Sequence, residues 1–186
     1  MKNSICIIFI LFLSSCSQTQ TNDKSSDDNK TANKIFTKEE IAELSKKYLV
    51  NIIPNPKLSS DTDFVSISNG EYPWSDGPGN DDYFVYEIHQ KYILIGDLNG
   101  DNFDDAEVQL IISYGGNSAT AEQLIFINED GILKPYLHSK NLPDIFFNEI
   151  KSGILYGIEE KRDEDYNLKQ KKVQYQLIGK KLVEIN

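Results

Sequence analysis

The spacing of apolar residues near the start of the folded region predicts a helix. Apolar positions recur at helical spacing through residues 38–53, at Ile41, Leu44, Tyr48 and Leu49. The stretch "TKEE" just before them has the sequence of a capping box, with Thr37 as the N-cap and Glu40 at the third helical position. Pro54 is expected to end the helix, because the residue that precedes a proline rarely adopts helical backbone angles.

Beyond this helix the apolar period changes to two, which is typical of strands. We expect a hairpin in which Gln90 and Lys91 join strand 84–89 to the apolar run 92–95. Further strands are expected at 108–114, 123–127, 132–137, 146–158 and 172–185, the last two segments being strand pairs that turn at Gly153 and Gly179. The acidic segment 159–172 is expected to be an exposed, mobile connection.

These elements predict an α+β fold, with an N-terminal helix followed by a mainly antiparallel β-sheet in a single domain at residues 35–186. The chain has 186 residues, of which 39% are hydrophobic, enough for one domain with a real core. Its formal net charge is −10, and no dense Lys/Arg cluster occurs outside 169–172. A nucleic acid is therefore not an expected partner.

The N-terminus has the pattern of an export signal. Lys2 precedes nine apolar residues at 5–13, too few for a membrane-spanning helix, which needs about 20. The next residues, "LSSC" at 13–16, resemble the bacterial lipobox, in which the cysteine is lipidated after the preceding signal is removed. The resemblance implies a lipoprotein signal peptide at 1–15 and lipidation of Cys16, which would attach the protein to a membrane.

Residues 16–34 are predicted to be the lipidated cysteine and a disordered tether. No residue of 17–34 is both apolar and larger than Ala32, so this segment cannot bury enough surface to offset the entropy of ordering. Ser17 matches the outer-membrane sorting residue of Gram-negative lipoproteins. We therefore expect a lipid anchor in the cell envelope, with the outer membrane favoured and its periplasmic or surface face left open.

The stretch "GDLNGDNFDDA" at 96–106 is the candidate metal site. Oxygen ligands at alternate positions suit a hard cation such as Ca²⁺, and the candidate ligands are Asp97, Asn99, Asp101, the Phe103 carbonyl and Asp105. The alternative is a polar turn, since Asp and Asn also form Asx-turns. An EF-hand is excluded, because its twelfth position would be Val108 and the loop lies between strands.

The spacing resembles the D-x-[DN]-x-D-G-x-x-D calcium loop of FG-GAP and VCBS-type β repeats, which implies a structural Ca²⁺. Asn102 stands where that motif has Gly, and Asn tolerates the same left-handed backbone. The motif occurs once here, so the resemblance does not extend to a propeller. From residue 96 to 186 the chain is also similar to a group of exported bacterial proteins without an assigned activity, which supports export and adds no catalytic residue.

Three classes of function remain. The first is a lipid-anchored envelope protein whose calcium-clamped β domain is a non-catalytic binding or accessory module. The second is a glycan- or peptide-binding surface lipoprotein that uses the aromatic residues Tyr72, Trp74 and Tyr83 of a Gly/Pro-rich loop. The alternative for these aromatics, which we favour, is that they pin the loop to the sheet. The third is a hydrolase, for which no carboxylate pair is evident. His89 and His138 lack the spacing of a zinc site.

Overall fold

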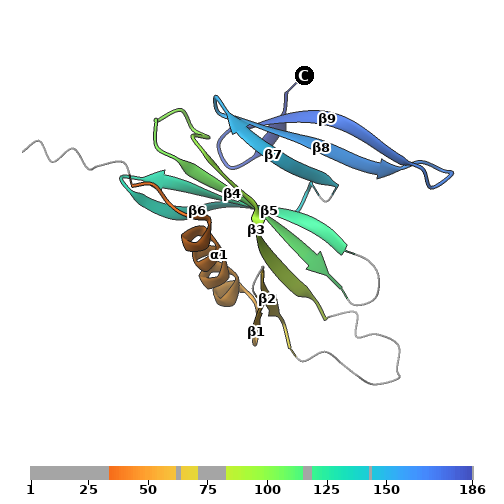
Figure 1. The fold of residues 1–186 in the computed structure, drawn as a ribbon, viewed down its shortest axis with the longest axis horizontal. Helices are drawn as coiled ribbons and strands as arrows, with labels where there is room; N and C mark the ends of the chain where they lie inside the picture. Colours follow the sequence, from red (N-terminus) through yellow and green to blue (C-terminus); the bar gives the residue numbers. More distant parts are fainter. Residues whose placement is uncertain (1–33, 62–63, 71–82, 115–118, 143, 186) are drawn as a thin grey trace, which may run out of the picture. The chain divides into compact units, whose positions relative to one another are not determined.

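The computed structural model describes residues 34–61, 64–70, 83–114, 119–142 and 144–185. Within these residues the chain forms one helix and two antiparallel sheets, of six and of four strands (Figure 1). The mainly antiparallel β architecture with one helix agrees with the pattern of the sequence. The sequence predicted one sheet, however, and the structure divides the strands between two.

Helix α1 (Lys38–Ile52) begins with the predicted capping box. The Glu40 amide donates to the Thr37 hydroxyl at 3.2 Å, and the Thr37 amide donates to the Glu40 carboxylate at 3.0 Å. Both residues thus pair amide groups that have no partner inside the helix. The predicted helix is confirmed, and Ile53 is its C-cap, directly before Pro54.

The six-stranded sheet is a meander in which every strand pairs with its neighbours in sequence. Its strands are β1 (Lys57–Ser60), β2 (Phe64–Ser68), β3 (Val85–Gly96), β4 (Asp105–Ser113), β5 (Ala119–Glu129) and β6 (Ile132–Ser139). The predicted turn between β5 and β6 is confirmed, with Gly131 at φ 85°. The predicted hairpin at Gln90 and Lys91 is wrong, because both residues lie inside β3. Instead of a turn, the β3–β4 pairing has an irregularity in its register between Ile88 and Ile93.

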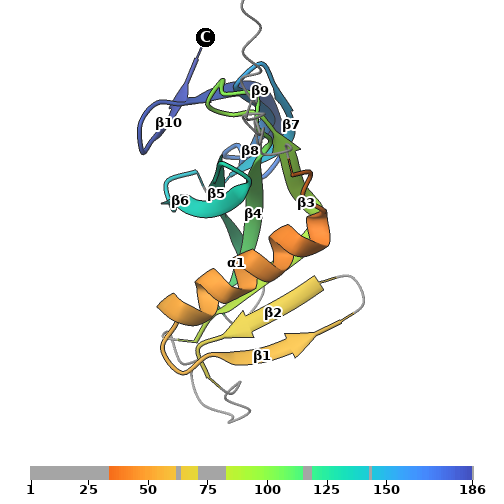
Figure 2. The same ribbon diagram turned by 90° about the vertical axis from the view of Figure 1, so that its left-hand side faces the viewer.

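Helix α1 packs on one face of this sheet, against β2, β3 and β4 (Figure 2). Apolar side chains from the helix and from alternate strand positions form one core cluster there. Its fully buried members include Ile41, Leu49, Ile67, Ile93, Val108, Leu110, Leu124 and Phe126. Along β4 the even-numbered residues from Ala106 to Ile112 belong to this cluster, so the odd-numbered residues point to the opposite face.

The four-stranded sheet covers that opposite face. Its strands, in spatial order, are β10 (Leu182–Glu184), β9 (Leu168–Leu177), β8 (Ile154–Arg162) and β7 (Ile145–Lys151). A second core cluster joins Ile125 and Ile127 of β5 to residues of the four-stranded sheet, namely Ile145, Phe147, Leu155, Val173 and Tyr175. The two sheets approach closely at Gly96, where an added Cβ would lie 2.9 Å from Ile150 Cγ2.

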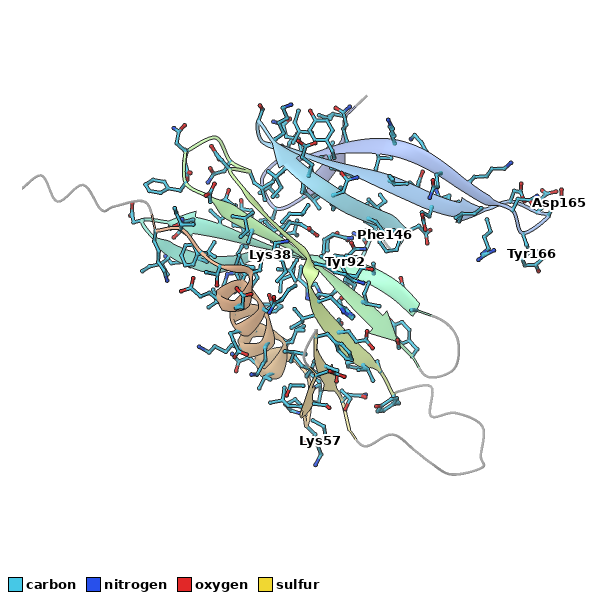
Figure 3. The ribbon with its side chains drawn as sticks, viewed as in Figure 1. Lys38, Lys57, Tyr92, Phe146, Asp165 and Tyr166 are labelled. Carbon is cyan, nitrogen blue, oxygen red and sulfur yellow. The ribbon has the colours of Figure 1, made fainter. Side chains whose placement is uncertain are left out.

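The acidic segment 159–172 is a strand pair rather than a mobile connection. β8 and β9 remain in register out to Arg162 and Leu168. Asp163 then closes the turn by accepting the amides of Asp165 and Asn167 at 3.1 and 2.9 Å. Asp165 and Tyr166 lie at the tip of this hairpin (Figure 3). The apolar pattern could not reveal these strands. Both faces of the outer part of β9 are exposed, so its sequence is polar and charged without apolar residues at alternate positions.

Candidate functional site

The loop between β3 and β4 is organised by its own acidic and amide side chains. The two carboxylate oxygens of Asp97 accept the amides of Gly100 and Asn102 at 2.6 and 2.9 Å. Asn99 Oδ1 accepts the Asp101 amide at 2.9 Å, and Asp101 Oδ1 accepts the Phe103 amide at 2.8 Å. These bonds curl the chain around the side-chain oxygens of Asp97, Asn99 and Asp101.

Two residues of this loop adopt the left-handed backbone that the motif requires. Gly100 has φ 84° and Asn102 has φ 69°. The prediction that Asn102 takes the conformation of the usual glycine is therefore confirmed. Asn is the residue other than glycine that reaches this region most readily.

Asp105 is buried and links the loop to a neighbouring strand. Its carboxylate accepts the Leu98 amide and the Asn128 amide, each at 2.8 Å. Burial raises the pKa of Asp105, the two backbone N–H groups oppose that rise, and the charges of Asp101 and Asp97 add to it. The carboxylate of Asp105 thus connects the loop, the start of β4 and the end of β5.

The first three predicted ligands, Asp97, Asn99 and Asp101, each use their side-chain oxygens to accept N–H groups of the loop. Asp97, Asn99 and Asp101 carry their oxygens on one short loop, and each oxygen that accepts an N–H keeps a second lone pair. Asp105 already serves two backbone amides. Among the described residues, no group of three or more His, Cys, Asp or Glu side chains gathers as a metal cage. A cation here would therefore need the Asn99 amide oxygen and the Phe103 carbonyl as well.

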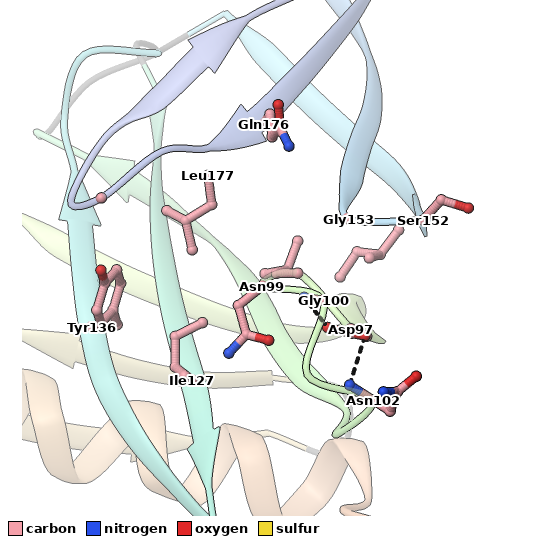
Figure 4. A pocket seen from close by; sticks show the side chains of 13 residues that line it. Asp97, Asn99, Gly100, Asn102, Ile127, Tyr136, Ser152, Gly153, Gln176 and Leu177 are labelled. Atoms are coloured by element: carbon pink, nitrogen blue, oxygen red, sulfur yellow. Dashed lines mark hydrogen bonds between the residues drawn. The ribbon is translucent and has the colours of Figure 1, made fainter. Parts of the chain in front are cut away.

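The loop also forms one wall of a cavity of about 700 Å³ (Figure 4). The other walls come from β5, β6, the β7–β8 turn and the end of β9. The lining residues are Asp97, Leu98, Asn99, Gly100, Asn102, Ile127, Tyr136, Ile150, Ser152, Gly153, Gln176, Leu177 and Gly179. The polar side chains among them are mostly neutral, and Ile127, Leu177 and Ile150 supply an apolar surface. The lining thus combines neutral hydrogen-bonding groups with an apolar surface.

A buried polar network on the helix-covered face was not predicted from the sequence. Glu122 of β5 accepts the Tyr86 hydroxyl at 3.1 Å and contacts His138 Nε2 at 2.6 Å. His138 Nδ1 in turn contacts the Tyr48 hydroxyl of α1 at 3.3 Å. Burial, together with the Glu122 charge, raises the pKa of both tyrosines. Through His138 the network joins the helix to three strands.

The remaining predicted residues are divided between described and undescribed parts of the chain. Cys16, Tyr72 and Trp74 lie outside the described residues, as does the predicted tether at 16–34 apart from Lys34. Tyr83 is described and is half-buried. In the part of the chain that the structure covers, no helix is long and apolar enough to cross a membrane.

Fold and site together define a mainly antiparallel β protein in which an Asp- and Asn-rich loop lines a cavity between two sheets. No protein-family model, curated protein or solved structure matches this chain.

Proposed function

We propose that this chain is a lipid-anchored protein of the bacterial cell envelope whose single α+β domain, led by its N-terminal helix, is a non-catalytic binding module. The observation that carries the proposal is that the Asp97–Asn102 loop lines the cavity of about 700 Å³. That volume is within the range of small-molecule pockets, about 300–1,000 Å³. A cation held by the loop would thus fix one wall of the binding pocket.

The loop geometry supports calcium as that cation. Asp97, Asn99, Asp101 and the Phe103 carbonyl would hold it, with Asp105 anchoring the loop from behind through Leu98. Bound calcium supplies a counter-charge to the acidic side chains that the loop gathers. The chain's own residues preform the loop, since the Asx bonds and the φ of Asn102 are already in place.

The lining of the cavity favours binding over hydrolysis. Among the described residues that line it, Asp97 carries the one carboxylate, whereas glycoside hydrolysis by the usual route needs two about 5–10 Å apart. Asn99, Gln176 and Ser152 are neutral hydrogen-bonding groups. They suit a neutral polar ligand, for which a glycan or a peptide of the envelope are candidates.

The anchor and the location follow from the N-terminal sequence. Cys16 would carry the lipid, and 17–34 would hold the domain on the order of 20–25 Å from the membrane as a flexible tether. A second candidate, a surface lipoprotein that binds through Tyr72, Trp74 and Tyr83, rests on their sequence alone.

The test is a thermal melt of the chain from Ser17 onward, in EDTA and then with calcium or magnesium. With a Kd of about 10⁻⁴ M, typical of extracellular modules, about 1 mM calcium should stabilise the fold by about 1.4 kcal/mol. For a domain of this size the melting temperature should rise by about 3–6 °C.

Two variants make the melt specific to the loop. Asp101→Asn should remove the calcium response, because it removes a charged ligand while keeping an oxygen for the Phe103 amide. Asp104→Asn removes a neighbouring charge outside the candidate ligand set and should keep the response. If several millimolar calcium leaves the melting temperature of the unsubstituted chain unchanged, the loop is a polar turn and the calcium proposal is wrong.

A further inference from the structure

Four buried oxygen atoms between the two sheets have no hydrogen-bond partner among the residues that the structure describes. They belong to three side chains: both carboxylate oxygens of Glu107 and the amide oxygens of Gln109 and Gln123. All three residues are at most 1% exposed. Leaving a buried polar atom unpaired costs about 1–3 kcal/mol, and more for a charged one. A donor or a cation that is not part of the described chain would remove this cost by binding these oxygens.

The three side chains share one face of the six-stranded sheet. Glu107 and Gln109 are two residues apart on β4, and Gln109 pairs with Gln123 across the β4–β5 ladder. The amide nitrogens of Gln109 and Gln123 both donate to the Ile145 carbonyl, at 3.3 and 3.1 Å. Because both nitrogens meet the same atom, the two amide groups lie side by side, with their oxygens free.

A proton on Glu107 does not satisfy this group. It supplies one donor, which can pair with one glutamine oxygen and leaves the other glutamine oxygen and the second carboxyl oxygen without partners. A cation, in contrast, takes several oxygen ligands at once, so one ion between these side chains would meet oxygens that a single proton leaves unpaired. Carboxylate and amide oxygens are the ligands that hard cations prefer.

Charge balance selects the class of cation. Glu107 is 0% exposed, so an ionised carboxylate here needs a counter-charge. Gln109, Gln123 and the Ile145 carbonyl are neutral. One carboxylate balances one positive charge, whereas a divalent ion would leave a net charge in the low-dielectric space between the sheets.

We propose that Glu107, Gln109 and Gln123 form a binding site for a monovalent hard cation, with sodium as the expected occupant. The site is separate from the calcium loop in its ligands and in its ion. Its two glutamines hold the first residue of β7 through the Ile145 carbonyl, so the bound ion would brace the contact between the two sheets.

The test compares thermal melts of the chain from Ser17 onward, refolded in sodium chloride or in choline chloride of equal ionic strength. EDTA is present throughout, so the calcium loop does not contribute. Choline is too large for a buried oxygen cage. When sodium is about tenfold above its Kd, the melting temperature should be about 3–6 °C higher in sodium than in choline.

Variants assign the difference to the proposed residues. Glu107→Gln removes the charge at nearly constant shape and should abolish the difference between sodium and choline. Glu149→Gln makes the same chemical change at an exposed position of β7 and should retain it. Asp101→Asn should also retain it, so a failure of the calcium loop and a failure of this site give different results.

Equal melting temperatures in sodium and choline would overturn the proposal, as would an equal difference in Glu107→Gln. A crystal structure grown in sodium chloride gives a test that needs no variant. An ion held by Glu107 and both amide oxygens supports the site. A water molecule there, or a direct contact between the Glu107 carboxyl and an amide oxygen, refutes it and makes Glu107 a neutral acid.

Discussion

Replacing Asp105 should separate the loop from β5. In Asp105→Ala the amides of Leu98 and Asn128 both lose their acceptor, and Leu98 is buried with only 3% of its surface exposed. Solvent cannot easily replace the lost partner at that position. The variant therefore tests whether one carboxylate holds the loop, the start of β4 and the end of β5 together.

The expected loss follows from the two hydrogen bonds. A hydrogen bond to a charged acceptor contributes about 1.5–3 kcal/mol, so the pair is worth about 3–6 kcal/mol. Burial of the carboxylate, which raises the pKa of Asp105, offsets part of this. We expect Asp105→Ala to lower the free energy of unfolding by about 3 kcal/mol. Asp105→Asn keeps one acceptor and places an NH₂ group against the other amide, so its loss should be about 2 kcal/mol.

Urea unfolding followed by circular dichroism measures both losses, and hydrogen exchange locates them. The amides of Leu98 and Asn128 should lose protection in Asp105→Ala, while β8 and β9 stay protected until global unfolding. Asp104→Ala is the matched control, because Asp104 pairs with Asn128 through its backbone carbonyl, and its loss should stay within about 0.5 kcal/mol. Asp105 variants as stable as this control, with Leu98 still protected, would refute the reasoning.

Two further predictions concern the anchor and the buried network. Metabolic labelling with an alkyne fatty acid should tag the full chain and should fail in Cys16→Ser; labelling of that variant would contradict the lipobox assignment. Tyr86→Phe removes one hydrogen bond to Glu122 and should cost about 1–2 kcal/mol in urea unfolding, whereas His138→Ala removes the 2.6 Å partner of a buried carboxylate and should cost about 3 kcal/mol or more. A smaller loss in His138→Ala than in Tyr86→Phe would show that His138 is not the main partner of Glu122.

Local chemistry made parts of this fold predictable. The capping box places the start of α1 at Lys38, and Gly153 and Gly179 mark turns with φ 75° and 54°. Asn102 was predictable for the same reason, since the loop spacing demands a left-handed residue there. In each case the determining residues lie within a few positions of one another, so their interaction can be inferred from the sequence.

Long-range partners were not predictable in this way. Glu122 and Tyr86 are 36 residues apart, and His138 and Tyr48 are 90 residues apart. Period-two alternation assigns each residue to a face but not to a partner strand. The division into two sheets was missed for the same reason, because β6 and β7 are both antiparallel strands and nothing in their sequence states that they do not pair.

The alternation along β4 has a consequence for how the chain tolerates insertions. Even positions from Ala106 to Ile112 are apolar, whereas Asp105, Glu107 and Gln109 occupy the odd positions. A slip of one residue would exchange the two faces, pushing Glu107 into the helix-side core and Val108 toward Ile145. The polar stripe therefore selects a single alignment of the central strand during folding. Homologous chains should vary in length at the strand ends, and one-residue insertions within 105–111 should be selected against.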